Sequence, residues 1–219
     1  MQVRRSSQTI AGRRCHQAIM LSSRPCSMPI LPIVIAQNSP KPLARWITRE
    51  ALVEGAEPLT MTWLFHPDSL TRRLTALSAD HFSVTPLFEG WQALRSDECA
   101  ALALPEQSVG WVREVYLRGH GEKWVFARSV AARDALLQSG LHMDQLGSRS
   151  LGELLFCDPA FERGPLQVCH YPAAWLPAAD ATDGLWGRRS CFSRGALNIL
   201  VAEVFLPTLW QALGNPEHC

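Results

Sequence analysis

Two charged side chains lie in segments whose other residues predict buried β-strands. Arg113 is part of WVREVYL, and because side chains alternate between the faces of a strand it shares a face with Trp111 and Val115. Glu203 is part of LNILVAEVFLP, whose two faces are both apolar, as is typical of a central, covered strand. A buried guanidinium cannot lose its charge and needs an anion nearby. The chemistry indicated is therefore the binding of an anion by Arg113, with Glu203 as a second buried polar group.

Two interpretations of this pair stay open from the residues alone. Arg113 and Glu203 can bond to each other across the sheet, although desolvation makes such buried pairs weak stabilisers. Alternatively, they line a closed pocket and hold the two ends of a small polar ligand, and Arg113 then has no protein counter-ion. The predicted helix starts at Leu70 and Leu151 would offer free main-chain N–H groups to an anion if they converge on Arg113.

Helical patterns surround these strands. LARWITREALV has loosely helical apolar spacing, and EPLTMTWLF continues it after a break at Gly55. Residues 66–78 predict a helix capped by Asp68 or Ser69, with leucines at helical intervals. Residues 129–140 predict a short helix or turn. Further along, the S-x-x-E spacing that starts at Ser150 predicts a helix from the next residue.

The strand patterns follow one another as hairpins. Residues 82–94 predict a strand in which Pro86 indicates an edge position or a bulge. Residues 111–130 predict two strands joined by a turn at 119–121. Residues 185–207 predict two final strands with a turn at 193–195. Successive hairpins accompanied by a few helices predict an α+β fold with an antiparallel sheet.

Length and composition limit the classes of function. A chain of 219 residues can bury one full core, and its formal net charge of +1 gives no reason to expect nucleic acid or an anionic membrane as partner. No apolar run approaches the roughly 18 residues of a spanning helix. The 7 cysteines contain no C-x-x-C pair, which argues against a disulfide scaffold or structural zinc and predicts a cytoplasmic location.

The first 42 residues differ from the rest in composition. No acidic residue precedes Glu50, and arginine and serine are frequent there. This composition is compatible with an organelle transit peptide, but prolines interrupt a continuous helix. We expect residues 1–42 to be a disordered or non-native leader and residues 43–213 to be the folded domain.

Common catalytic and metal-binding motifs are absent from the sequence. There is no phosphate-binding P-loop, no dinucleotide glycine motif, no H-E-x-x-H and no G-x-S-x-G. The neighbours Cys169 and His170 make a poor nucleophile–base couple, because the fold normally brings such residues together from separate segments. His66, His81 and His120 lack the spacing of metal ligands, so the sequence predicts no metal.

Five segments in order resemble one family. PDSLTRRL, WVREVYL, SLGELLF, GLWGRRSCF and LVAEVFLP resemble the chorismate–pyruvate lyases, which open ubiquinone synthesis in many bacteria. The resemblance spans roughly residues 59–209. It implies a single antiparallel sheet with helices packed over it and helical flaps that enclose the ligand. It also implies an enzyme without metal or cofactor that converts chorismate into 4-hydroxybenzoate and pyruvate, and we expect this chain to be a monomer.

The resemblance also implies roles for individual residues. Arg113 would bind the ring carboxylate of chorismate together with main-chain groups of Leu70 and Leu151. Leu70 replaces a methionine expected at that position, a change that a main-chain contact tolerates. Glu203 would face the ring hydroxyl, so Arg113 and Glu203 are the expected catalytic pair and all four residues the expected substrate site.

A second cation for the enolpyruvyl carboxylate is desirable. Arg188 and Arg189 in GRRSCF are candidates, although a solvated, charged hairpin end is the alternative interpretation of that segment.

The main rival function is a binding module of the same fold. Ligand-sensing domains of some bacterial transcription regulators resemble this lyase in architecture and bind small effectors without chemistry. They normally follow a winged helix-turn-helix, and residues 1–58 show too little helical pattern for one. The sequence therefore favours the enzyme.

Overall fold

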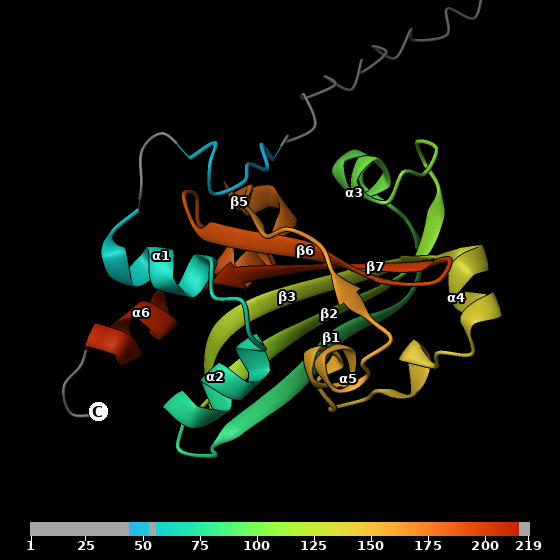
Figure 1. The fold of residues 1–219 in the computed structure, drawn as a ribbon. Coiled ribbons are helices and arrows are strands. Elements are labelled where there is room, and N and C mark those ends of the chain that lie inside the picture. Colours follow the sequence, from blue (N-terminus) through green and yellow to red (C-terminus); the bar gives the residue numbers. More distant parts are fainter. Residues whose placement is uncertain (1–43, 53–55, 215–219) are drawn as a thin grey trace, which may run out of the picture. The chain divides into compact units, whose positions relative to one another are not determined.

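The computed structural model describes residues 44–52 and 56–214, and the expected leader at 1–42 lies outside them. The described residues form one antiparallel sheet with helices on both of its faces (Figure 1). The strands are β1 Phe82–Ala93, β2 Val109–Gly119, β3 Glu122–Ala132, β4 Glu162–Arg163, β5 Gln167–His170, β6 Trp186–Arg194 and β7 Leu197–Phe205. The α-helices are α1 Pro58–Leu64, α2 Leu70–Leu77, α3 Ser96–Ala101, α4 Arg133–Ser139, α5 Leu151–Cys157 and α6 Pro207–Gly214. Short 3-10 turns are η1 Met143–Gln145, η2 Ala173–Trp175 and η3 Ala178–Asp180. The predicted α+β class with a single antiparallel sheet is confirmed.

The strand order in the sheet is β1-β2-β3-β7-β6-β4, and β5 also pairs with β6. Every pair is antiparallel. β3 and β7 are neighbours although about seventy residues separate them, because the final hairpin returns to the open side of the first one. The long hairpin β2–β3 and the last hairpin β6–β7 therefore form the centre of the sheet, where Arg113 and Glu203 lie.

β1 is an edge strand, and its register with β2 shifts between Pro86 and Phe88. Proline has no N–H to give to a ladder, so an edge position with a bulge accommodates it. The sequence predicted an edge position or a bulge at Pro86, and the structure has both. The shift also changes which side chains of β1 face those of β2, with a consequence for Arg113.

The β2–β3 turn requires a glycine at its start. A Cβ on Gly119 would lie 2.1 Å from ring carbons of Trp124, so any larger residue would displace the indole. His120 and Gly121 then adopt positive φ of 50° and 82°, which close the hairpin. The predicted turn at 119–121 is confirmed.

Apolar cores pack on both faces of the sheet. On one face α1, α2, α4 and α5 contribute Leu64, Leu74, Leu136 and Leu155, and in Figure 1 α2 and α5 lie in front of the strands. On the other face α3 and the segment after β5 contribute a second pair of clusters. Each fully buried leucine contributes about 1.5–3 kcal/mol of transfer free energy. Since both faces are covered, neither face of the central strands is solvated.

Several helix predictions are confirmed, and one is wrong. α1, α2 with Ser69 as its cap, α4 ending before a left-handed Gly140, and α5 beginning at Leu151 all match. Residues 44–52 instead form a bridge to β5 through Ile47 and a turn, because the apolar residues there cover the sheet edge rather than a helix face. α3, α6, β4 and β5 were not predicted, and the last turn falls at 195–196, slightly later than expected. No helix among residues 44–52 and 56–214 is long and apolar enough to cross a membrane.

Candidate active site

Two neighbouring rows of side chains cross one face of the sheet from β2 through β3 and β7 to β6. One row is Arg113, Ser129, Val201 and Ser190, and the next is Val115, Ala127, Glu203 and Arg188. Strands lie about 4.8 Å apart, so the strands of Arg113 and Glu203 are separated by about 10 Å. The β3 side chains between them, Ala127 and Ser129, are small. The two charged residues thus face the same side of the sheet, and only small side chains of β3 stand between them.

Arg113 is 2% exposed and is held by three hydrogen bonds. Its Nε donates to Oε1 of Glu89 at 2.6 Å. Its Nη2 donates to the carbonyls of Gly147 at 2.6 Å and of Arg149 at 3.0 Å. No hydrogen bond to a described residue uses Nη1. Nε and Nη2 of the guanidinium are therefore fixed by protein, and Nη1 has no hydrogen-bond partner among the described residues.

The expectation that Arg113 has no protein counter-ion is wrong, because Glu89 forms an ion pair with it. The β1 bulge is the physical reason. Pro86 pairs with Val115, but after the shift Phe88 pairs with Glu114 and Glu89 pairs with Arg113. Without the extra residue, Glu89 would face the opposite side of the sheet.

Glu203 pairs with Arg188, which lies directly opposite it on β6. Nε of Arg188 donates to Oε2 of Glu203 at 2.7 Å. Nη1 of Arg188 donates to the carbonyls of Trp63 at 3.0 Å and of His66 at 3.3 Å, which fixes the end of α1 over the sheet. Arg113 and Glu203 therefore do not bond to each other. Each is paired with a different residue, and Oε1 of Glu203 accepts no hydrogen bond from a described residue.

The helix starts at Leu70 and Leu151 lie beside each other, close to the segment that contacts Arg113. Ser150 caps α5, and its hydroxyl is hydrogen-bonded to that of Thr71 in the first turn of α2 at 2.6 Å. The carbonyls that Arg113 contacts belong to the segment just before this cap. Leu70 and Leu151 are both buried, at 3% and 4% exposure. The two helix starts are thus neighbours, and the segment before Leu151 contacts Arg113, while the roles of Leu70 and Leu151 in binding stay a prediction.

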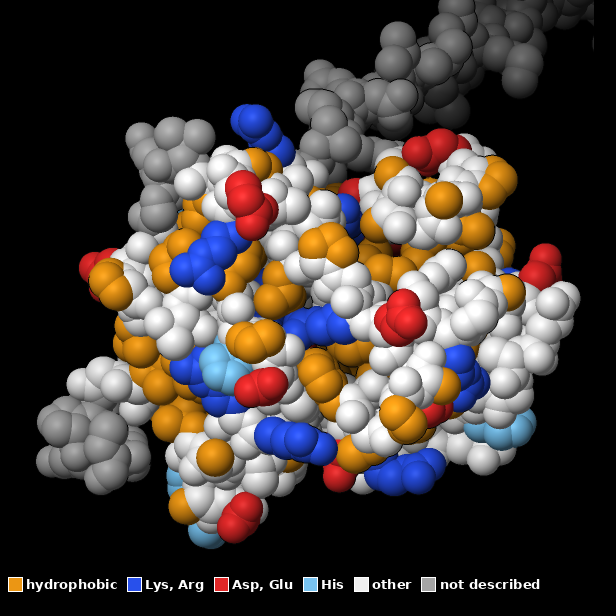
Figure 2. Space-filling view, viewed as in Figure 1, with side chains coloured by type: hydrophobic (Ala, Val, Ile, Leu, Met, Phe, Trp, Pro, Cys, Tyr) orange, Lys and Arg blue, Asp and Glu red, His pale blue; other side chains and the backbone are white. Residues whose placement is uncertain are grey.

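A cavity of about 560 Å³ borders these helix starts. Thr71, Arg149 and Ser150 are part of its lining, together with residues of β1 and α5. Drawn from the side of α2 and α5, Figure 2 shows a surface that is hollowed near the middle, with basic and apolar side chains around the hollow. Open space therefore adjoins the segment that holds Arg113.

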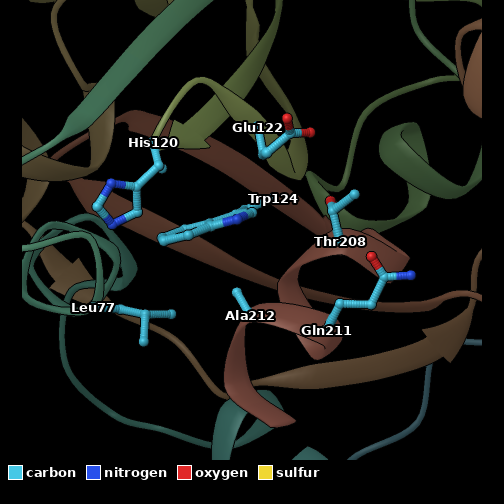
Figure 3. A pocket seen from close by; sticks show the side chains of 8 residues that line it. Leu77, His120, Glu122, Trp124, Thr208, Gln211 and Ala212 are labelled. Atoms are coloured by element: carbon cyan, nitrogen blue, oxygen red, sulfur yellow. The ribbon is translucent and has the colours of Figure 1, made fainter. Parts of the chain in front are cut away.

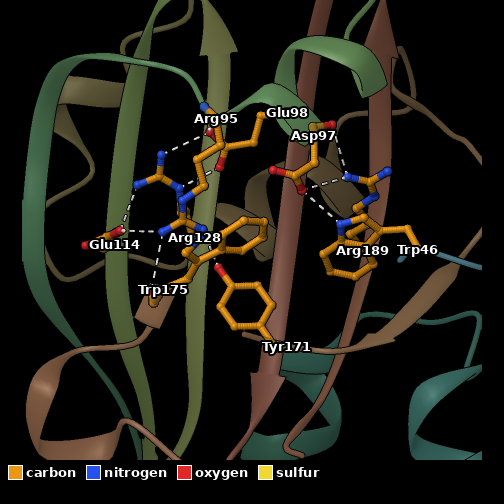
Figure 4. Close-up of polar contacts among 9 residues, drawn as sticks. All are labelled: Trp46, Arg95, Asp97, Glu98, Glu114, Arg128, Tyr171, Trp175 and Arg189. Carbon is orange, nitrogen blue, oxygen red and sulfur yellow. Dashed lines mark hydrogen bonds and ion pairs between the residues drawn. The ribbon is translucent and has the colours of Figure 1, made fainter. Parts of the chain in front are cut away.

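Arg188 and Arg189 face opposite sides of the sheet. Arg189 donates from Nε to Gln167 at 2.9 Å and from Nη1 to Asp97 at 3.2 Å, and its guanidinium lies over the ring of Trp46 (Figure 4). The alternative of a solvated hairpin end is wrong, because the two arginines are 1% and 7% exposed. Only Arg188 is on the face of Glu203, so Arg189 is excluded as a second cation for the site.

The opposite face carries a network of charges that the sequence analysis missed. Arg128 pairs with Glu98 at 2.6 Å and with Glu114 at 2.8 Å, and Arg95 donates to the hydroxyl of Tyr171 (Figure 4). Burial disfavours the charge of Arg128, but the two carboxylates outweigh burial and raise its pKa. The positive and negative charges in this network balance. Its ion pair between Arg128 and Glu98 joins α3 to the sheet, and the bond from Arg95 to Tyr171 joins α3 to the segment after β5.

Cys169 is unsuited to nucleophilic chemistry. It is 3% exposed, and burial raises the pKa of its thiol to about 12. His170 beside it points the other way and contacts the carbonyl of Gly184 and the ring of Trp186. The rejection of this couple from the sequence is confirmed.

A separate pocket of about 210 Å³ lies at the β2–β3 turn (Figure 3). Trp124 and His120 line it on the hairpin side, with Leu77 of α2 and Gln211 of α6 opposite. None of the rows that carry Arg113 and Glu203 contributes to its lining. It is distinct from the candidate active site.

The comparisons with known proteins give the family. The family model described as chorismate lyase matches residues 43–214. The chain belongs to the chorismate lyase family. A probable chorismate pyruvate-lyase of Pseudomonas syringae pv. tomato is 68% identical over 173 residues, covering 79% of this chain and 93% of that one. Probable chorismate pyruvate-lyase 2 of Pseudomonas fluorescens is 65% identical over 184 residues, covering 84% of this chain and all of that one. The resemblance drawn from five short segments is confirmed.

Solved structures resemble this chorismate lyase family member more distantly. The C-terminal domain of PhnF has a TM-score of 0.47 and 13% identity, and the match covers 58% of this chain and 84% of that one. The possible transcriptional regulator YydK of Bacillus subtilis has a TM-score of 0.44 and 9% identity, and the match covers 59% of this chain and 60% of that one. These similarities are too weak to support an argument about function.

Proposed function

We propose that this protein is a lyase that removes pyruvate from chorismate and leaves 4-hydroxybenzoate. Membership of the chorismate lyase family supports the reaction class. The observation that carries the proposal is a pair of arginine–carboxylate contacts on one sheet face, in which the arginines are buried and the carboxylates partly buried, separated by the small side chains of Ala127 and Ser129. Each end of the site therefore holds an arginine and a carboxylate, Arg113 with Glu89 at one end and Arg188 with Glu203 at the other.

The ring carboxylate of chorismate binds at Arg113 in this proposal. Nε and both hydrogens of Nη2 already donate to the protein, so Nη1 is the nitrogen of Arg113 that donates to the ligand carboxylate in this proposal. Main-chain N–H groups of Leu70 and Leu151, at the starts of α2 and α5, supply further donors. Closure of α2 and α5 over the ligand, as the family's flaps, is part of the same proposal.

Glu203 faces the ring hydroxyl at the other end. The ring carbon that carries this hydroxyl loses a proton, the bond from the neighbouring carbon to the enolpyruvyl oxygen breaks, and the ring becomes aromatic. The enolpyruvate takes up a proton at its methylene carbon and becomes pyruvate. Oε1 of Glu203, which has no partner among the described residues, is the candidate proton acceptor. Aromatisation drives the reaction, so the protein mainly holds the reactive conformer and stabilises the departing charge.

We further propose that the reaction serves ubiquinone synthesis and that the protein is a cytoplasmic monomer. The test is to incubate the purified full chain with chorismate and measure 4-hydroxybenzoate and pyruvate separately. Equal amounts of both, above the decay of chorismate with heat-inactivated protein, are expected. A folded preparation that binds chorismate without turnover would contradict the proposal and favour the effector-binding alternative.

A further inference from the structure

A third arginine lies beside the Arg188–Glu203 pair. Arg163 of β4 donates from Nε to the hydroxyl of Ser190 at 2.8 Å and from Nη1 to the carbonyl of Pro67 at 2.7 Å. Its guanidinium carbon is 5.4 Å from the ring centre of Phe156 and 5.5 Å from that of Phe192. These contacts fix the guanidinium in one place, although β4 is only two residues long.

The contact with Ser190 places Arg163 on the site face. Ser190 is in the same row as Arg113, and Arg188 is two residues before it on the same strand. Arg163 therefore lies on the far side of Glu203 from Arg113. The candidate site has cations on both sides of its central carboxylate.

The charge of Arg163 is not neutralised by an ion pair. Within residues 44–52 and 56–214, no carboxylate lies at ion-pair distance from it. Burial and the neighbouring charge of Arg188 lower the pKa of Arg163 to about 10, and Glu203 and Asp68 act in the opposite direction. Glu203 thus pairs with Arg188 alone, and Arg163 and Arg188 each have an Nη2 that donates to no described residue. An anion bound between them would relieve this excess of positive charge.

We infer that Arg163 and Arg188 bind the second carboxylate of the substrate, on the enolpyruvyl group that leaves as pyruvate. This inference rests on the proposed function. The enolpyruvyl group is attached to the ring carbon next to the hydroxyl. With the ring carboxylate at Arg113 and the hydroxyl at Glu203, that group extends toward β6 and β4. Positive charge there also stabilises the enolate that forms as the carbon–oxygen bond breaks.

The inference separates substrate from product. Chorismate has two carboxylates and uses both cationic ends, whereas 4-hydroxybenzoate has one and leaves Arg163 without a ligand. Arg163→Gln should therefore lower kcat/KM for chorismate by about 10- to 100-fold, the value of a charge-assisted hydrogen bond. The same variant should change the Kd of 4-hydroxybenzoate by less than about threefold, because this product has no second carboxylate and makes no contact with Arg163.

Arg163→Lys and Arg194→Gln complete the experiment. Lysine keeps the charge but not the planar fork, so an intermediate loss is expected. Arg194, also at the sheet surface and over an aromatic ring, pairs with Asp158 away from the site, and Arg194→Gln should leave both measurements unchanged. Thermal melting verifies that each variant is folded, and Arg163→Lys keeps the test decisive if the glutamine variant is unstable.

Two results would overturn the inference. One is an equal weakening of chorismate and 4-hydroxybenzoate, which would give Arg163 a structural role only. The other is an unchanged kcat/KM in a folded Arg163→Gln variant. If the unsubstituted chain fails to turn over chorismate, the proposed function fails. The inference is then tested by the Kd of chorismate. An equal Kd for the unsubstituted chain and for Arg163→Gln would refute it.

Discussion

Glu89 offers the most direct test of how the site treats an anion. It neutralises Arg113 from one edge, and the proposed ligand carboxylate binds the other edge. In Glu89→Gln the amide oxygen can keep the hydrogen bond to Nε, so the guanidinium stays in place while the negative charge is removed. The variant should therefore bind 4-hydroxybenzoate more tightly.

The size of the effect follows from Coulomb's law. A carboxylate on the far edge of the guanidinium would lie about 6 Å from that of Glu89, and their repulsion at an effective dielectric of about 20 is about 3 kcal/mol. The Glu89 side chain is 23% exposed, and solvent screening reduces this value. About half of it remains in our estimate, which corresponds to an affinity about tenfold higher.

Glu114→Gln is the matched control. Glu114 follows Arg113 on β2 but faces the other side of the sheet, and its side chain is 22% exposed. Its partner Arg128 keeps a second carboxylate, Glu98, and Arg95, whose ion pair with Glu114 is long at 4.0 Å, keeps its hydrogen bonds to Tyr171 and Trp175. The substitution therefore removes the same charge with little change in the contacts of either arginine.

Isothermal titration calorimetry near neutral pH measures the Kd of 4-hydroxybenzoate for the unsubstituted chain, Glu89→Gln and Glu114→Gln. An unchanged or lower affinity of Glu89→Gln would refute the assignment of the carboxylate to Arg113. Equal gains in Glu89→Gln and Glu114→Gln would show that net charge, rather than the local pair, controls binding.

Two further predictions concern chemistry and pH. Glu203→Gln should lower kcat by about 100-fold or more, because an amide accepts a hydrogen bond but no proton, and unchanged steady-state turnover would leave Glu203 only an orienting role. Burial raises the pKa values of Cys169 and Tyr171 to about 12, so both remain protonated in the folded chain at a pH where they ionise in the unfolded chain. The unfolded state then binds fewer protons, and the free energy of unfolding should fall as the pH rises above about 9. Cys169→Ser should reduce that fall between about pH 9 and 11 by about 2 kcal/mol in urea titrations, and equal slopes would contradict the burial argument.

Local patterns in the sequence determined much of the framework. Strand alternation and apolar composition identified Arg113 and Glu203 as charges in buried strands, and in the structure Arg113 is buried and Glu203 partly buried. Serine caps fixed the starts of α2 and α5, because a hydroxyl that satisfies a free N–H acts within one helical turn. These signals depend only on residues a few positions apart.

The partners of the charged residues depend on tertiary structure. Glu89 reaches Arg113 because a bulge shifts the register, and Arg163 reaches the site from a strand too short to show periodicity. Arg188 and Arg189 look alike in sequence, and only the packing of both sheet faces assigns one to Glu203 and the other to Asp97. Alternation tells which residues of one strand share a face. It does not tell which distant segment covers that face, because the pairing of strands far apart in the chain is decided by packing of the whole core.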